Sequence, residues 1–550
     1  MTTHRSPIFA LSDSYVEKSA RLSPMASTYL GITDLNDQLD DFSIAGRAVE
    51  ADLTRATLTE LNALEPIDEI DRVAKSVMQE RLTSSLQLHD SFESHIDFNV
   101  LTSPPADIRQ VFEMMPKESA ADFENIAKRL LAVDKAHLSW ISTIDTLGKK
   151  GKTAAQRQID GIAKQLESYA NGGYVGMAKT FDPDGKYPAI HEAAKAAAKS
   201  AADTAAYLRG TYMALATPND AVGAERYAVW ALYFTGSKLD LRATYEWGLA
   251  DLAQITERMW KVAARIKPDA KTLREVADYL DNAPEYKIHG KEAILKKLLD
   301  FTQTAVAQMD GTHFDIDERI KFCDARLAPE GSASAPYYMS PSEDLSRPGT
   351  TWLPLLGKDE VSWWHLASTW YHEAVPGHHL QIATSVLERE RLSRFQRFGA
   401  SISGYSEGWA LYAERFMDDL GAFDEPGIEM GFLSAQALRA TRIVIDIGMH
   451  LGYTDENGRV WDAVSGREAL MNKALLDESH ATSETDRYLG WPGQAISYKV
   501  GERAWIAARE NAKTRLGAEF SLKRFHAHAL KIGPMGLDNF GQELALWDGK

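Results

Sequence analysis

Trp370-Tyr-His-Glu-Ala-Val-Pro-Gly-His-His-Leu-Gln381 is the stretch around which we expect the rest of the chain to be organised. It begins like the HExxH signature of zinc peptidases, in which two histidines on one helix face bind the metal and the glutamate acts as general base. The spacing departs from that signature, because Pro376 occupies the position of the second histidine and the next histidines are His378 and His379. A metal site here therefore requires an irregular helix.

A regular helix cannot bring either later histidine to an ion held by His372. On such a helix His378 lies about 9 Å further along the axis and roughly 120° round, and His379 lies about 10.5 Å along on the same face. Each imidazole nitrogen must lie about 2.0–2.1 Å from zinc. Pro376 cannot donate to the carbonyl of His372, and Gly377 adopts unusual dihedral angles at little cost. The Pro-Gly pair therefore predicts a bulge or a kink that returns a later histidine to the first.

Two interpretations of these histidines remain open from the residues alone. A core helix broken by Pro-Gly would leave them capped or facing solvent, whereas a metal site would bring them together. Histidine is scarce, with 15 in 550 residues, so a cluster of three favours the metal site. We expect His378 to be the second ligand, because a smaller bulge leaves fewer backbone groups without partners. His379 is the alternative if the helix merely kinks, and would otherwise donate to a carboxylate near the metal or to substrate.

Composition and charge indicate an ordinary globular protein without a nucleic-acid or membrane partner. The 550 residues are 44% hydrophobic and 25% charged, with a net charge of −17. Such an acidic chain does not favour binding to a phosphate backbone. No apolar run approaches the length of a membrane span, and no signal-peptide pattern is present. The single cysteine, Cys323, suits a reducing cytosol. We therefore expect a cytoplasmic protein, whose oligomeric state the sequence leaves open.

Apolar spacing predicts that most of the chain is helical. The expected helices cover residues 41–65, 67–88, 118–147, 153–171, 188–216, 224–266 (or two helices broken near Gly236), 270–281, 291–308, 361–375, 379–395, 405–420, 431–451, 465–477 and 493–512. A chain of this length exceeds the usual size of a single core. We expect helical subdomains over 1–310 and a metal-binding catalytic region over 311–550, packed into one body.

Residues 335–354 interrupt the helices with a run rich in proline, glycine, serine and aromatic side chains. We expect two short strands there, Tyr337–Met339 and Thr350–Leu353, around a turn-rich loop. A surface loop without strands is the alternative that residue types alone leave open.

The run HExxPGHHxQ, from His372 to Gln381, resembles the signature of the bacterial domain-of-unknown-function family numbered 885. The resemblance covers most of the chain, and its specific motifs lie in residues 337–501. Proteins of that family are regarded as zinc peptidases distantly akin to the gluzincins. The resemblance thus implies Zn²⁺ as cofactor and a mainly α-helical, multi-helix body with a gluzincin-like active-site cleft. It also favours the two strands, as a small β edge segment next to the metal helix that can bind an extended peptide.

A helix that supplies two histidines to zinc needs a third protein ligand and an open position for water. Glu407 opens an apolar helical run, and the phrase Glu-Gly-Trp-Ala-Leu-Tyr resembles the family's own, which implies Glu407 as that ligand. Glu414 lies about 10.5 Å further along the same face and is better placed to hydrogen-bond a metal-binding histidine. As the alternative, both are surface glutamates. Glu373 is then the general base for an attacking water.

A later segment places Arg442, Asp446 and His450 at four-residue steps, with Arg439 beside them. From spacing alone, a ladder of ion pairs on a helix surface is favoured. The segment also resembles the family's Asp-x-Gly-x-His pattern, which favours a catalytic role for His450 facing the substrate.

The segment from Arg487 to Gly501 resembles the family's pattern Arg-Tyr…Pro-Gly-Gln-Ala-x-Ser-Tyr-Lys-x-Gly closely. The resemblance implies that the phenol of Tyr498 steadies the oxyanion of the tetrahedral intermediate. Arg487 is then suited to bind a peptide carboxylate with two hydrogen bonds, and Gln494 to project from the start of a helix toward substrate. A packed aromatic residue and a surface cation are the alternatives.

Two other groupings have spacings that suggest metal sites, and we interpret both as surface features. Asp477 and His480 share the carboxylate-x-x-histidine spacing of di-iron bundles, but such bundles need paired copies with partner glutamates. His526 and His528 occupy alternate positions of a helix and therefore point apart.

These features predict a zinc-dependent hydrolase, foremost a peptidase that cleaves short peptides with Glu373 as general base. One alternative keeps the metal and hydrolyses an amide or ester of a small metabolite. Another is a non-catalytic helical binding protein with a degenerate metal site. Intact Glu373 argues against degeneration, whereas the altered HExxH spacing argues for it.

Overall fold

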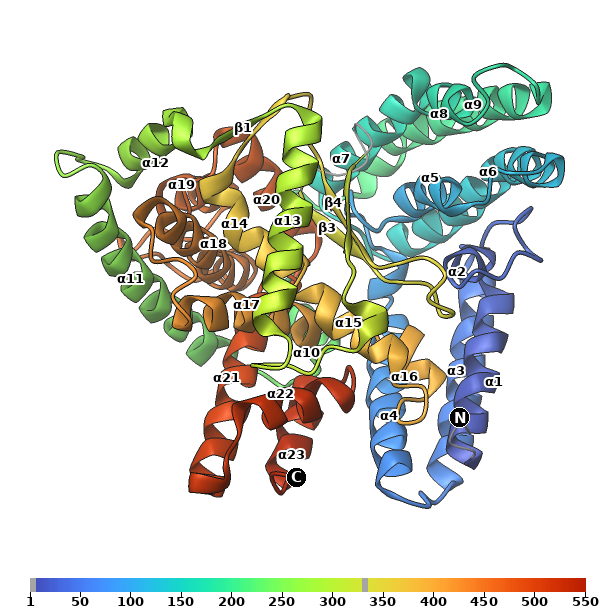
Figure 1. Cartoon of the computed structure of the whole chain (residues 1–550). Helices are drawn as coiled ribbons and strands as arrows, with labels where there is room; N and C mark the ends of the chain where they lie inside the picture. The colour runs from blue at the N-terminus through green and yellow to red at the C-terminus, as the bar shows by residue number, and fades with distance from the viewer. Residues whose placement is uncertain (1–5, 329–334) are drawn as a thin grey trace.

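The computed structural model describes residues 6–328 and 335–550 (Figure 1). Its regular structure is almost entirely α-helical, which confirms the predicted fold class. The helices of the first 310 residues are α1 (Pro7–Leu22), α2 (Pro24–Tyr29), α3 (Ile44–Ala63), α4 (Glu69–Asp90), α5 (Pro104–Met114), α6 (Ala120–Gly148), α7 (Gln156–Ser168), α8 (Tyr174–Phe181), α9 (Pro188–Gly210), α10 (Gly223–Thr235), α11 (Leu241–Ile266), α12 (Leu273–Asn282) and α13 (Lys291–Met309).

The remaining helices form the part of the chain that contains the motif. They are α14 (Trp363–Glu373), α15 (His378–Leu387), α16 (Arg394–Phe398), α17 (Ser403–Asp419), α18 (Pro426–Leu451), α19 (Ala463–Lys473), α20 (Glu478–Gly490), α21 (Ser497–Leu516), α22 (Leu522–Lys531) and α23 (Leu537–Leu546). Within the described residues, no helix is both long enough and apolar enough to span a membrane.

Most expected helices are present, with ends set by local signals. The alternative of two helices over residues 224–266 is confirmed, because Gly236 takes a left-handed conformation (φ 62°) and ends α10. The side chain of Asp240 then accepts a hydrogen bond from the Ala243 amide and caps α11. The helix expected over 379–395 is instead split into α15 and α16. The helix expected from 493 begins only at Ser497.

Two large hydrophobic cores organise the molecule. One lies among α5 to α9 and includes Ile126 and Trp140. The largest core combines Val77 of the N-terminal helices with Trp409 and Trp505 of the C-terminal region. Side chains that come before and after residue 310 in the sequence thus share one core. The domain boundary that we expected at residue 310 stays a prediction.

A small sheet lies beside the helices that carry the motif (Figure 1). Its strand order is β2-β4-β3, with β2 (Asp324–Leu327) parallel to β4 (Thr350–Leu353) and β3 (Tyr337–Met339) antiparallel to β4. The two strands predicted from the sequence are therefore confirmed, and β2 was not predicted. A second pair, β1 (Lys287–His289) with β5 (Glu360–Ser362), leads into α14. The position of β3 at the edge of its sheet agrees with the expected edge segment.

The motif is not carried by one bulged or kinked helix, as we expected from the sequence. α14 ends at Glu373 and α15 begins at His378, with a cis Val375–Pro376 peptide bond between them. Ala374 has a ψ of −116°, which ends the helical path. A Cβ atom at Gly377 would lie 1.9 Å from the carbonyl oxygen of His372, so only glycine fits in this turn. Two separate helices therefore present the histidines.

α17 and α21 cross with their backbones in contact. A Cβ atom added to Gly408 would lie 2.5 Å from the Cα atom of Gly501, so neither position has space for a side chain. Gly408 follows Glu407 directly, and Gly501 comes one helical turn after Tyr498. The close crossing therefore holds the start of α21, which carries Tyr498, against α17, which carries Glu407.

Candidate metal centre

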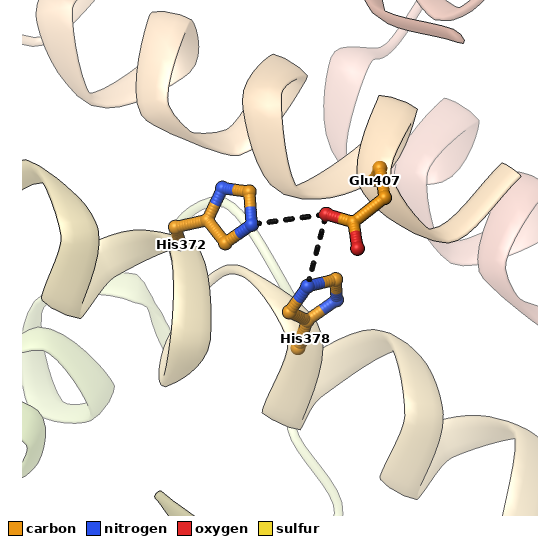
Figure 2. Close-up of side chains that lie close together, drawn as sticks. All are labelled: His372, His378 and Glu407. Atoms are coloured by element: carbon orange, nitrogen blue, oxygen red, sulfur yellow. Dashed lines mark hydrogen bonds and ion pairs between the residues drawn. The ribbon is translucent and has the colours of Figure 1, made fainter. Parts of the chain in front are cut away.

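His372, His378 and Glu407 come together from α14, α15 and α17, and their side chains point toward one another (Figure 2). One carboxylate oxygen of Glu407, Oε2, lies 3.2 Å from His372 Nε2 and 3.4 Å from His378 Nε2. The three ligand atoms all lie within 4.8 Å of one another. Of the two candidate histidines, the structure thus brings His378 to His372 and Glu407.

The spacing of these atoms fits a zinc ion. Two ligands that are each about 2.0–2.1 Å from zinc, at a tetrahedral angle, lie about 3.3 Å apart. The distances of 3.2 and 3.4 Å from Glu407 to the two histidines match that value. Two imidazoles and one carboxylate are also the ligand set of several catalytic zinc sites, which leave one position open. The donor set and its spacing therefore suit a catalytic divalent ion.

The hydrogen bonds of His372 hold its ring in one orientation. Nδ1 donates to Glu414 Oε1 over 2.8 Å, and Ser368 donates to the same carboxylate. Glu414 is completely buried. The expectation that Glu414 hydrogen-bonds a histidine of the group is confirmed. Although burial lowers the pKa of His372, its bonds to Glu407 and Glu414 raise that pKa to about 9 in the metal-free protein.

Glu373, the last residue of α14, lies beside the group but makes no hydrogen bond to another described residue. Its side chain is only 7% exposed, and burial raises its pKa. Electrostatic interactions with His378, His372 and Arg439 oppose that rise. Glu373 is therefore a carboxyl group without a fixed protein partner, next to the candidate metal position.

His379 points away from the other two histidines. Its Nε2 lies 2.7 Å from the Ile320 carbonyl oxygen, and its Nδ1 lies 3.0 Å from the Tyr338 hydroxyl. Burial lowers the pKa of His379 to about 4, so the neutral ring donates to Ile320 and accepts from Tyr338. We expected His379 to donate to a carboxylate or to substrate, but it links α15 to the sheet instead.

Tyr498, in the first turn of α21, lies beside the candidate metal group formed by His372, His378 and Glu407. Its ring lies 6.3 Å from that of His372 at an interplanar angle of 20°. The guanidinium of Arg442 packs over the Tyr498 ring, 4.6 Å from the ring centroid. Burial and the charge of Glu407 raise the pKa of Tyr498, which keeps the phenol protonated as a hydrogen-bond donor. The structure thus brings Tyr498 to the position that the sequence motif implied.

Arg487 and Gln494 lie near Tyr498 but bond mainly to the protein. Arg487 donates to Gln494 Oε1 over 3.3 Å and to Glu484 Oε2 over 3.1 Å. Gln494 donates to Ser403 Oγ over 3.4 Å. It lies in the turn before α21 rather than in the helix, because that helix begins at Ser497. Protein partners thus occupy the groups that we expected to bind substrate.

The structure does not bring His450 to the metal group. His450 is 1% exposed, and its two ring nitrogens lie 3.1 Å from the Tyr488 carbonyl oxygen and 3.3 Å from the Val222 amide. Asp446, also buried, accepts from the Tyr227 hydroxyl and the Gly493 amide. Both nitrogens of His450 are therefore used within the protein. The alternative of an ion-pair ladder on a helix surface is wrong, because this helix face is buried.

The two other groupings have different outcomes. Asp477 and His480 are exposed and bond to each other over 2.6 Å, as a surface pair should. His526 is completely buried, with its Nε2 2.8 Å from the Tyr412 hydroxyl and its ring stacked on Phe314. The expectation that His526 lies at the surface is wrong, because it fills a gap between aromatic side chains in the largest core.

Sequence reasoning missed Glu484, which joins several side chains around Tyr498. Its Oε2 accepts from Arg442 Nη2 over 2.7 Å, from Arg487, and from the Tyr488 hydroxyl. The spacing of Glu484 to Arg487 and Tyr488, at three and four residues on one helix, was the signal that could have revealed it.

Comparison with known proteins places the chain in a family. The sequence profile of the family described as "bacterial protein of unknown function (DUF885)" matches residues 24–544. A comparison with curated proteins finds no match.

Two solved structures share the fold. The crystal structure of a "putative lipoprotein" from Colwellia psychrerythraea is 21% identical over 98% of both chains, with a TM-score of 0.85. A "putative lipoprotein of unknown function" from Shewanella oneidensis is 17% identical over 98% of this chain and 100% of that chain, with a TM-score of 0.74. Because the family profile covers nearly the whole sequence, the chain belongs to the bacterial family DUF885.

Proposed function

We propose that the protein is a zinc-dependent hydrolase related to the gluzincins, and that its substrates are short peptides. The observation that carries this proposal is the approach of His372 Nε2, His378 Nε2 and Glu407 Oε2 to within 4.8 Å of one another. The glutamate comes from a downstream helix, as in a gluzincin, whereas the two histidines come from two helices rather than from one. When bound there, Zn²⁺ would lower the pKa of a coordinated water and polarise a substrate carbonyl.

Two residues beside the ligands have the properties that hydrolysis requires. Glu373 has no hydrogen-bond partner among the described residues, so its carboxylate is free to accept the proton of an attacking water. It can then return that proton to the leaving amine. Tyr498, whose ring lies 6.3 Å from that of His372, supplies a phenol O–H, which can donate to the carbonyl oxygen that gains charge as water adds to the carbonyl.

The edge strand favours a peptide over a small metabolite as substrate. β3 pairs with β4 on one side, and the described residues form no further strand on its other side. Tyr338 in the middle of β3 bonds to His379, so the strand lies against α15, whose first residue is His378. A peptide added to such an edge gains backbone hydrogen bonds that a small amide cannot make.

The cytoplasmic location expected from the sequence stays a prediction.

Metal analysis together with a peptide-library cleavage assay tests this proposal. Purified protein is expected to hold about one zinc ion per chain by elemental analysis, as one site with three protein ligands implies. The zinc-loaded protein should cleave members of the library, and a chelator should abolish the cleavage. Protein that cannot be loaded with zinc contradicts the metal site. A loaded protein that cleaves small amides or esters but no peptide favours the metabolite hydrolase.

Replacing Tyr498 with phenylalanine tests the oxyanion role. This change removes one hydroxyl and keeps the ring between His372 and Arg442, so the fold and the metal content should not change. The expected result is a kcat lower by about 10²–10³, as for the loss of one oxyanion donor. Steady-state kinetics on a library-derived peptide measures the effect. A variant that only raises KM would assign Tyr498 to substrate binding instead.

A further inference from the structure

Three guanidinium groups gather near Tyr498 and influence its pKa. The guanidinium of Arg442 lies 4.6 Å and that of Arg439 6.0 Å from the ring centroid. Arg487 approaches from α20 through the Glu484 carboxylate. Two of the three come from α18 and one from α20, so separate elements bring positive charge to one place.

The protein supplies too few carboxylates to neutralise this group. Glu484 accepts from both Arg442 and Arg487, so one negative charge is shared between two cations. The carboxylate paired with Arg439 is Glu414, at 3.9 Å, which is too long for a hydrogen bond. Glu414 already accepts from His372 and Ser368. Arg439 therefore has no carboxylate of its own.

Arg439 also retains donors without acceptors. Its side chain is only 9% exposed, and its one hydrogen bond to a described residue runs from Nη1 to the Ala435 carbonyl over 3.1 Å. Its Nε is buried without a partner, as is the Nε of Arg487. Arg442 uses Nε for the Tyr488 hydroxyl and Nη2 for Glu484, and its Nη1 bonds to no other described residue. The two Nε atoms are enclosed, but Arg439 Nη2 and Arg442 Nη1 bond to no described residue and are not enclosed, so they are the donors available to an anion.

We propose that Arg439 and Arg442 bind the terminal carboxylate of a peptide, so that the protein removes residues from the carboxyl end of its substrates. This inference rests on the proposed function and names its substrate class. We expected Arg487 to bind a peptide carboxylate, but Arg487 already donates to Glu484 and Gln494. We therefore assign this role to Arg439 and Arg442. Guanidinium groups suit the planar carboxylate because their N–H donors match its two oxygens.

The distances place the Arg439 guanidinium close to His372. Arg439 Nη2 lies 3.9 Å from the Glu414 oxygen, which lies 2.8 Å from His372 Nδ1. The guanidinium is therefore within two residue lengths of that ring, at about 3.3–3.6 Å per residue of extended chain. This nearness agrees with a terminal carboxylate that belongs to the same short peptide as the cleaved bond.

The pairing of charges beside Tyr498 agrees with a bound anion. Arg442 and Arg487 share the Glu484 carboxylate, and Arg439 lies 3.9 Å from Glu414, which also bonds to His372. The carboxylate of a free peptide end would add a negative charge beside Arg439 and Arg442, whereas an amidated peptide end would not.

Binding measured without turnover tests this inference. The probe is N-acetyl-tetraalanine with a free carboxyl end, compared with the same peptide amidated, each titrated by calorimetry into zinc-loaded protein carrying Glu373→Gln. The free acid is expected to bind about 10- to 100-fold more tightly, as for a charge-assisted pair. Adding Arg439→Gln should remove most of that preference. Equal binding of acid and amide, or a preference that survives Arg439→Gln, would overturn the inference.

Further variants and one further peptide test whether the preference depends on the Arg439 guanidinium and on a carboxylate at the chain end. Arg503→Gln removes the same charge from α21, where Arg503 is exposed and packs on Trp247, and it should keep the full preference. Arg439→Lys keeps the positive charge but loses the planar guanidinium group. Folded, zinc-loaded protein with this change should show an intermediate preference. An amidated peptide that ends in glutamate tests the other source of a carboxylate. If it binds as tightly as the free acid, the group recognises an acidic side chain and the terminal assignment is wrong.

The failure of this inference can be told apart from that of the proposed function. Peptide cleavage by the wild-type protein without any preference for the free acid would overturn the inference and leave the hydrolase in place. A preference for the free acid in protein that hydrolyses no peptide would leave the carboxylate site in place and contradict the hydrolase.

Discussion

Replacing His378 with alanine is expected to lower zinc affinity by several orders of magnitude, whereas His379→Ala should change it by less than about 10-fold. His378 Nε2 lies 3.4 Å from Glu407 Oε2 and belongs to the group that fits the ion. His379 bonds to Ile320 and Tyr338 and to no residue of that group. Two adjacent histidines, changed in the same way, should therefore differ sharply in metal binding.

The two variants should also differ in stability. His379→Ala leaves the Ile320 carbonyl and the Tyr338 hydroxyl without their partner, which costs about 1–3 kcal/mol in free energy of unfolding. His378→Ala removes a ring whose Nδ1 has no hydrogen-bond partner among the described residues, so the metal-free protein should lose less. Competition titration with a chromogenic chelator and thermal unfolding of metal-free protein measure the two effects. Loss of zinc in His379→Ala with retention in His378→Ala would reverse the assignment.

Much of the fold could be predicted because local signals set it. The spacing of apolar residues gave the long helices, and a left-handed glycine at position 236 divided α10 from α11. Proline, glycine and aromatic residues marked β3 and β4 with their observed limits. β2 was missed, because its four residues carry no alternation strong enough to distinguish a strand from a loop. Its strand identity comes from pairing with β4, which lies far along the chain.

The residues of the candidate metal group could be predicted from the sequence, but the backbone conformation that brings them together could not. Zinc binds thiolate, imidazole and carboxylate ligands, and a chain with one cysteine and 15 histidines offers few positions where such ligands can cluster. How the chain returns His378 to His372 depends on the turn between them, and Pro-Gly permits several turns. The structure has a complete break at Ala374 rather than a bulge. A choice among such turns depends on surrounding groups such as Trp409, whose indole donates to the carbonyls of Pro376 and Gly377.

Buried polar residues were the hardest to interpret from sequence. Catalytic groups and internal hydrogen-bond networks use the same residue types, and the partner that distinguishes them is remote in sequence. His450 is held by Val222 and Tyr488, and His526 by Tyr412. Spacing along one helix cannot reveal such partners. Glu414 was the exception, because the helical repeat placed it about two turns beyond Glu407 on the same face, toward the same histidine.

Replacing Glu373 with glutamine is expected to lower kcat by about 10²–10⁴ while the protein keeps its zinc. The amide has nearly the same shape as the carboxylate but cannot accept a proton from water. Glu373 is not one of the three residues whose ligand atoms converge, so its charge is not needed to hold the ion. Its side chain makes no hydrogen bond to another described residue, so the fold should tolerate the change. Elemental analysis and kcat on the same sample measure both properties.

The variant Glu414→Gln is the matched control, because it makes the same chemical change at a carboxylate that contacts His372 at Nδ1 rather than at Nε2. Glu414 accepts from His372 Nδ1 over 2.8 Å, so its loss should weaken zinc binding about 10- to 100-fold. At saturating zinc, its kcat should fall far less than that of Glu373→Gln, because it does not accept the proton of the attacking water. One carboxylate then governs turnover and the other metal affinity. Full activity in Glu373→Gln would contradict its role as general base, since no other residue placed beside the ligands is a free carboxylate.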